Sequence, residues 1–393
     1  SNKLNDIINL INKNALETAE TKVVDLLNVE GESDTIYNIL GIIYQKKNNY
    51  EKAIISFEKA INLNEKNVSA FTNLAVSFNS LGDEEKAMKY MRKALVINPE
   101  LFAVHNNIGF ILNKQKKYKE AIPYFQKAIK INSNYSQAYF NLGNSYNELE
   151  QTEKAVDNYN KAIEIKVDFE EAIFNLAEIY RKKNNYEKAI DFYKRTNNSK
   201  TNVRILECLF VLGKVDEYQE KILSFKKNDP LDRRIAAISA YASNQLNIKN
   251  EYSFCPDPLN YIYKTNVKKH TPDLEDFIKK LLNELDNLDF KWQPAGKTTV
   301  KGYGTIGNLS KIGLSEYKNF EKILEKEIAE YQNLFKNNSC NFITNWPKKH
   351  SFVSWSNRLK SEGHNIPHIH PSGWLSGVFY LKIPKEIKDN EAG

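Results

Sequence analysis

Apolar residues recur along the first half of the chain with a period of 34 residues. In each period a small residue follows Leu or Ile and precedes a large apolar residue by three positions. The column of small residues is Gly41, Ala75, Gly109, Gly143 and Ala177. A second column is Ala53, Ala87, Ala121, Ala155 and Ala189. Because small residues let two helices approach closely while large ones fill the space between them, the pattern predicts stacked helical hairpins.

This repeat resembles the tetratricopeptide repeat in its period and its residue types. Five full repeats are expected within residues 34–200, after a degenerate helical pair at residues 1–33. The period fades in residues 201–251, where we expect two or three irregular helices that cap the solenoid.

One column of the repeats is polar and consists of Asn73, Asn107, Asn141 and Asn175. An Asn amide both donates and accepts hydrogen bonds, so a ladder of them could hold an extended polypeptide. Some tetratricopeptide proteins bind peptides in this way, and the resemblance therefore implies a peptide groove. The alternative is a local structural role for an Asn that is common at this repeat position. The sequence leaves both interpretations open.

The 34-residue period is absent from residues 252–393, which we expect to form a separate domain. Thr271 and Pro272 are expected at the N-cap and first position of one helix, and a second helix is expected at about residues 315–335. Strands are predicted at residues 342–344, 351–357 and 375–383. Two helices followed by strands predict helices packed on a β-sheet or barrel.

Three glycines between these helices, Gly302, Gly304 and Gly307, match the pattern of dinucleotide-binding loops. That pattern binds a nucleotide only where it joins a strand to a helix in a βαβ unit. The surrounding residues 298–313 predict a loop instead. No nucleotide site is therefore expected here.

Two histidines, His368 and His370, precede an apolar run near the end of the sequence. Side chains alternate faces along a strand, so residues at i and i+2 project to the same side. Two neutral imidazoles that converge on one point are suitable ligands for a transition metal. The more distant His105 and His270 are interpreted as ordinary histidines.

The block His368-Ile-His370-Pro371, followed by Ser376-Gly-Val-Phe-Tyr-Leu381, resembles the Fe(II)- and 2-oxoglutarate-dependent oxygenases. The resemblance is to a family with the pattern H-x-H-P and then S-G-V-Y-Y-L. It implies a double-stranded β-helix, or jelly roll, in which His368 and His370 bind Fe(II). His370 stands where most oxygenases have Asp or Glu, although this family carries histidine there. The family places a third ligand and a keto-acid Arg further on, beyond Gly393, so the barrel is expected to be truncated in this sequence.

The same resemblance suggests residues that contact 2-oxoglutarate. Tyr380 matches a tyrosine that binds the distal carboxylate of the keto acid in related enzymes; its alternative role is a core aromatic. Asn357 and Arg358 precede the metal pair and could line the pocket, since Arg pairs with a carboxylate through two hydrogen bonds. A surface position is the alternative for Arg358.

Composition narrows the choice of partners and compartment. The net charge of +7 comes mostly from lysines spread along the chain, so no nucleic-acid partner is expected. No apolar run approaches the roughly 20 residues of a membrane span, so no membrane partner is expected either. The three cysteines are far apart in sequence, which favours a reducing, cytoplasmic location.

Together these patterns predict a multidomain α + β protein with an N-terminal α-solenoid of tetratricopeptide repeats and a C-terminal jelly-roll domain. The resemblance implies an Fe(II)- and 2-oxoglutarate-dependent dioxygenase that hydroxylates a protein or peptide side chain recruited by the solenoid. The alternative is a non-catalytic protein–protein interaction scaffold whose oxygenase-like domain is inactive or binds zinc.

Overall fold

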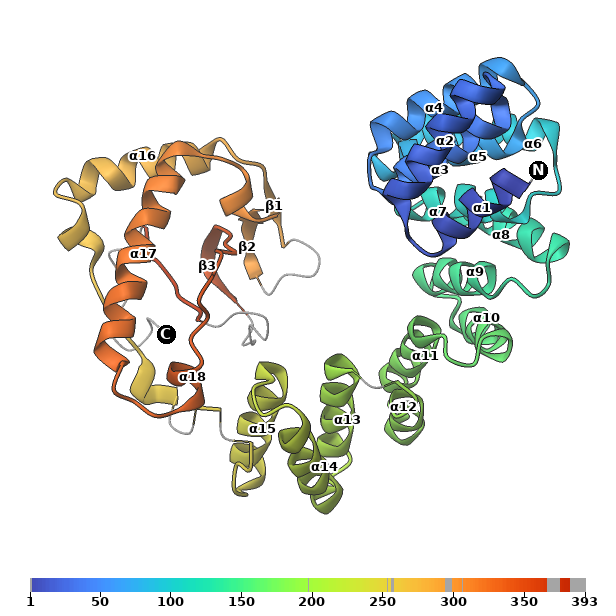
Figure 1. The fold of residues 1–393 in the computed structure, drawn as a ribbon. Helices are drawn as coiled ribbons and strands as arrows, with labels where there is room; N and C mark the ends of the chain where they lie inside the picture. Colours follow the sequence, from blue (N-terminus) through green and yellow to red (C-terminus); the bar gives the residue numbers. More distant parts are fainter. Residues whose placement is uncertain are drawn as a thin grey trace. The chain divides into compact units, whose positions relative to one another are not determined.

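The computed structural model describes residues 2–196, 198–252, 254–255, 258–293, 299–305, 307–365 and 375–381. They form two compact units that divide after Thr196 (Figure 1). Each unit has a hydrophobic core of its own. Among the described residues, no helix combines the length and the apolar character that crossing a bilayer requires.

The first unit is built only from helices, which pack as consecutive pairs, each pair against the next. They are α1 (Asn2–Asn12), α2 (Leu16–Glu30), α3 (Asp34–Lys46), α4 (Tyr50–Leu63), α5 (Val68–Ser80), α6 (Glu84–Ile97), α7 (Phe102–Lys114), α8 (Tyr118–Ile131), α9 (Ser136–Glu148), α10 (Thr152–Ile165), α11 (Glu170–Lys182) and α12 (Tyr186–Tyr193). The predicted helical solenoid is confirmed: α3–α12 are five helix pairs with the 34-residue period. The pair α1–α2 precedes them and packs on α3.

The repeated glycines allow the two helices of a pair to come close together. A Cβ atom at Gly109 would lie 2.7 Å from Cε1 of Phe125, which is fully buried on the second helix of the pair. Gly143 lies in the same way against the ring of Tyr159, where the corresponding distance is 2.8 Å. The ring of the second helix therefore occupies the space that a side chain on the first helix would need.

The turn inside each helix pair also repeats, and it contains one residue with a positive φ angle. These residues are Asn48 (59°), Gly82 (83°), Lys116 (60°), Glu150 (58°) and Asn184 (58°). They are spaced by 34 residues and follow the C-cap of the first helix. A left-handed residue at this place ends the helix and turns the chain back.

The second unit begins with three helices and continues with shorter elements, two further long helices and a small sheet. Its elements are α13 (Ser199–Val211), α14 (Val215–Asn228), α15 (Arg233–Leu246), η1 (Pro258–Tyr261), η2 (Val267–His270), α16 (Leu274–Asp286), β1 (Phe290–Trp292), β2 (Thr299–Thr305), η3 (Leu309–Lys311), α17 (Ser315–Phe335), α18 (Asn341–Thr344) and β3 (Asn357–Asn365). Two or three helices were expected in residues 201–251, and the structure has three, of which α13 begins at Ser199; α17 has the predicted bounds.

Helix α16 begins later than predicted. Its N-cap is Asp273, whose carboxylate accepts a hydrogen bond from the backbone N–H of Asp276 at 2.9 Å. The prediction that Thr271 and Pro272 occupy the N-cap and first position was wrong. Asp is as good an N-cap as Thr or better, and here it lies closer to the first apolar residue of the helix.

The sheet has three antiparallel strands in the order β1-β2-β3. Predictions of individual strands in this region were mostly wrong. Residues 342–344 lie in α18, and β3 starts where the strand predicted at 351–357 was expected to end. The described residues 375–381 contain no strand, and the predicted loop at 298–313 contains β2. The jelly roll stays a prediction.

The packing of the sheet explains why residue 302 is a glycine. A Cβ atom there would lie 2.9 Å from Cδ2 of Leu359 and 3.0 Å from the carbonyl oxygen of Arg358, so the neighbouring strand leaves no room for a side chain. The register shifts beside it, between Val300 and Gly302, as at a β-bulge. Two of the three glycines, Gly302 and Gly304, thus belong to a strand with a bulge, whereas a loop was predicted there.

Candidate functional site

The predicted metal pair cannot be placed geometrically, because His368 and His370 lie outside the described residues. The chain on both sides is placed. Strand β3 ends at Asn365 opposite Thr299 of β2, and Phe379 contacts Phe320 of α17 with ring centroids 4.8 Å apart. The two histidines as Fe(II) ligands stay a prediction.

Asn357 and Arg358 open strand β3, and neighbouring strand residues face opposite sides of a sheet. The Asn357 side-chain oxygen accepts a hydrogen bond from Oγ1 of Thr299 at 3.3 Å. The Arg358 guanidinium pairs with the carboxylate of Asp286 and lies 3.8 Å from the ring centroid of Phe290. At most one of the two side chains can therefore face a given pocket, and Arg358 already has a carboxylate partner.

Tyr380 lies at the surface, with 64% of the residue exposed. Its neighbours Phe379 and Leu381 pack against the hydrophobic core that includes Phe320. Side chains alternate in an extended segment, so the Tyr380 phenol points away from this core. It is not one of the core aromatics, and its contact with a keto acid stays a prediction.

The column of asparagines makes hydrogen bonds within the solenoid. Three of the four side-chain amides donate to an Asn of the preceding repeat: Asn73 to Asn38 (3.2 Å), Asn141 to Asn106 (2.9 Å) and Asn175 to Asn144 (3.0 Å). Asn141 is only 3% exposed. These contacts favour the structural interpretation for Asn141, whereas Asn73, Asn107 and Asn175 are partly exposed.

One pocket of about 260 Å³ lies in the solenoid between α9 and α11. Its lining is mostly polar and consists of Asn144, Asn147, Glu148, Asn175, Glu178, Ile179 and Lys182. Asn175 is thus the one member of the asparagine column that borders this pocket. Amides and charges of both signs at a concave surface are suited to a polypeptide backbone and its polar side chains.

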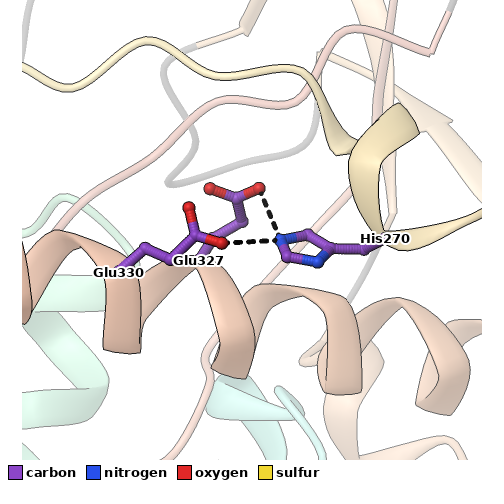
Figure 2. A group of neighbouring side chains, drawn as sticks. All are labelled: His270, Glu327 and Glu330. Carbon is purple, nitrogen blue, oxygen red and sulfur yellow. Dashed lines mark ion pairs between the residues drawn. The ribbon is translucent and has the colours of Figure 1, made fainter.

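A second cluster was missed by the sequence analysis. It consists of His270, at the end of η2, and of Glu327 and Glu330 on α17 (Figure 2). Nε2 of His270 lies 3.0 Å from Oε1 of Glu327 and 3.5 Å from Oε1 of Glu330. The sequence held one signal for it: Glu327 interrupts the apolar face of α17, four residues after Ile323 and four before Tyr331.

Lys269 balances part of the negative charge of this cluster. Its ammonium group lies 3.2 Å from Oε1 of Glu327 and also contacts Oε2 of Glu330. The hydrogen bond with Glu330 raises the pKa of Lys269, helped by one with Tyr263. The same bond with Lys269 lowers the pKa of Glu330. Both groups are therefore charged near neutral pH.

Comparison with protein families finds matches in the first half of the chain and in a short segment at residues 353–393. Residues 35–67, 68–101, 100–166 and 172–196 match families described as "Tetratricopeptide repeat". Residues 353–393 match the family described as "Putative 2OG-Fe(II) oxygenase". The chain joins tetratricopeptide repeats to an oxygenase-family segment. The curated proteins give no match.

Three of the solved structures that are similar to this chain are PilF, MamA and YrrB. PilF of Pseudomonas aeruginosa is 23% identical, with 53% of this chain and 97% of PilF covered and a TM-score of 0.46. MamA from Desulfovibrio magneticus RS-1 is 20% identical, with coverages of 41% and 92% and a TM-score of 0.38. YrrB, described as a TPR protein with an unusual peptide-binding site, is 22% identical, with coverages of 44% and 89% and a TM-score of 0.37.

Proposed function

We propose that this chain is an Fe(II)- and 2-oxoglutarate-dependent oxygenase that hydroxylates a polypeptide recruited by its repeats. The observation that carries the proposal is the match of residues 353–393 to an oxygenase family, within which the pattern His368-x-His370-Pro371 falls. Tetratricopeptide repeats provide protein–protein interaction, so the same chain combines a recruiting part with a reacting part.

His368 and His370 would be the Fe(II) ligands. The nitrogen atoms of two neutral imidazoles are suitable ligands for this ion, and the assignment rests on this preference. With Fe(II) and 2-oxoglutarate bound, dioxygen would be the oxidant: one oxygen atom would enter the C–H bond, and the other would leave in succinate as the keto acid loses CO2.

Tyr380 is the better candidate for contact with the keto acid. Its phenol is exposed and lies next to two residues that are anchored in the core. Arg358 would have to exchange Asp286 for the substrate carboxylate. Asn357 is hydrogen-bonded to Thr299 and would serve as a weaker, neutral contact.

The pocket between α9 and α11 is the proposed recruiting site. Asn175 and Asn144 present amides there, and Glu178 and Lys182 present opposite charges. Asn73 and Asn107 would extend the binding surface along the solenoid. Substitution of Asn175 by Ala should weaken binding of a polypeptide substrate, whereas the buried Asn141 is expected to affect folding instead.

The deciding experiment uses the whole chain with Fe(II) and 2-oxoglutarate under anaerobic conditions. We expect a weak visible charge-transfer band that disappears in the His368→Ala and His370→Ala variants. His350→Ala is the matched control, because His350 is an exposed histidine that pairs with Glu325, and the substitution should leave the band unchanged. A flat spectrum in the unaltered chain would favour the interaction scaffold, and zinc that does not exchange for iron at the same histidines would favour a zinc site.

A further inference from the structure

We propose that His270, Glu327 and Glu330 form a separate site for a divalent transition-metal ion, for which Zn²⁺ is the natural probe. The site does not depend on the proposed oxygenase activity, because it uses none of the residues of the H-x-H-P pattern. Its ligands come from η2 and α17, which are about 60 residues apart in the sequence.

The spacing of the three ligand atoms fits a single ion. In a tetrahedral Zn²⁺ site with metal–ligand distances of about 2.0–2.1 Å, neighbouring ligand atoms lie roughly 3.3 Å apart. Nε2 of His270 lies 3.0 Å and 3.5 Å from the nearest oxygens of the two glutamates, on either side of this value. All three ligand atoms lie within 4.8 Å of one another, and Figure 2 shows the imidazole nitrogen directed towards both carboxylates.

One ligand group contains a buried atom without a partner. Oε2 of Glu327 accepts no hydrogen bond within the described structure, whereas Nε2 of His270 is buried against the two carboxylates. The Glu327 side chain is only 9% exposed, and that of His270 11%. A buried carboxylate oxygen without a donor costs free energy, and a bound cation would remove this cost. This unpartnered oxygen distinguishes the cluster from an ordinary surface ion pair.

Surrounding groups hold the ligands in place while leaving coordinating atoms available. Thr265 donates to Oε1 of Glu327 at 3.2 Å, and Tyr263 donates to Oε2 of Glu330 at 3.2 Å. Lys269 contacts the same two oxygens. Oε1 of Glu330 and Nε2 of His270 remain for the ion, and Glu327 can offer either Oε1, which lies 3.0 Å from Nε2, or its unpartnered Oε2. Partners of this kind orient metal ligands in known sites.

The charges also favour a cation. Glu327 and Glu330 together carry two negative charges, and Lys269 supplies one positive charge. With a neutral imidazole, the net charge of the cluster is about −1 before an ion binds. A bound divalent ion changes this net charge to about +1. Three protein ligands leave one tetrahedral position for water, on the side where Glu330 is about half exposed.

The test measures Zn²⁺ binding by equilibrium dialysis on the full chain carrying His368→Ala and His370→Ala. These two substitutions remove the predicted iron ligands, so the result is independent of the oxygenase proposal. We expect about one bound equivalent, and an affinity reduced tenfold or more by Glu330→Gln and by His270→Gln. Glu330 is half exposed, so its substitution should leave folding intact, which circular dichroism would check.

The matched control is His350→Ala in the same background. His350 lies 2.8 Å from Glu325 of the same helix α17 but has no third ligand in the described structure. This variant should bind Zn²⁺ like its parent, and Zn²⁺ should raise the unfolding temperature of both. The proposal fails if the background chain binds no Zn²⁺, or if Glu330→Gln and His270→Gln bind it as tightly as the parent.

Discussion

At the scale of single residues, Lys116 and Glu150 occupy a backbone conformation that usually selects Gly or Asn. Their φ angles are 60° and 58°, in the left-handed region. The equivalent positions in other repeats carry Asn48, Gly82 and Asn184, which tolerate this conformation more easily. Lysine and glutamate at these turns therefore carry a local strain that the packing of the helix pair compensates.

Substitution of Lys116 by Gly should stabilise the solenoid. Lys116 is exposed, and removal of its Cβ relieves a conformational cost of about 1 kcal/mol. Urea unfolding followed by circular dichroism would measure the gain. Gly82→Ala at the equivalent turn is the paired control and should lose a similar amount. A loss of stability in the Lys116 variant would contradict the conformational explanation.

Residue roles were predictable where they follow from periodicity and were missed where they depend on distant parts of the chain. The small-residue columns specify close helix packing, and the rings of Phe125 and Tyr159 occupy that space. The hydrogen bond from Asn141 to Asn106 also joins neighbouring copies of the 34-residue repeat. His270, in contrast, meets Glu327 only because η2 packs beside α17, and no local pattern encodes that contact.

At the scale of elements, one side chain links the two long helices of the second unit. The carboxylate of Glu284, on α16, accepts hydrogen bonds at the N-terminus of α17 from the backbone N–H groups of Ser315, Glu316 and Tyr317. The Ser315 hydroxyl donates to it as well, at 2.7 Å. A helix N-terminus has unsatisfied donors and a partial positive charge, so this carboxylate both caps α17 and fixes its position against α16.

Glu284→Gln should lower the free energy of unfolding by about 1 kcal/mol near neutral pH. Burial opposes the charged form, but the hydrogen bonds from Glu316, Ser315 and Tyr317 outweigh it and lower the pKa of Glu284. A lowered pKa means that the carboxylate stabilises the fold above its unfolded pKa of about 4.3, and that this contribution is lost as the pH falls through the folded pKa.

Unfolding curves between pH 7 and pH 3 would test this. The difference between the parent and the Gln variant should shrink as the pH falls below about 4. Glu321→Gln, at a partly exposed position beyond the first turn of α17, is the control and should change little at any pH. A difference that stays constant down to pH 3 would show that the negative charge of Glu284 contributes nothing.

Prediction of elements from sequence worked for long helices and failed for short strands. Helix α17 shows 21 residues of helical periodicity, and its bounds were predicted correctly. Strand β2 contains two glycines and was predicted as a loop, because its conformation depends on pairing with β3. Residues 342–344 are Phe, Ile and Thr, which favour strands, but they lie in a single helical turn, where ring contacts of Phe342 with Tyr331 and Trp346 outweigh local propensity.

At the scale of the whole molecule, the two units have separate cores. Phe125 is fully buried in the first, and Leu281 is 1% exposed in the second. Truncation of a large buried side chain to Ala costs about 2–5 kcal/mol. If each unit folds cooperatively around its own core, that cost should be confined to the unit that contains the substitution.

Calorimetry of the full chain should therefore show two transitions that respond separately. Phe125→Ala should lower the temperature of one transition, and Leu281→Ala that of the other. Each variant serves as the control for its counterpart. If either substitution shifts the entire profile as one transition, the units unfold together and the division after Thr196 has no thermodynamic meaning.

The helix pair α1–α2 covers one end of the stack of repeats. Val23 of α2 is fully buried and belongs to the same cluster as Ile36 and Ile39 of α3, which are 3% and 7% exposed. In a chain lacking this pair, the buried isoleucine and leucine side chains of α3 would be exposed to water. Since one repeat is the natural cover for another, removal of α1 and α2 would leave this face of α3 free to bind the same face of a second copy, and the shortened chain should self-associate.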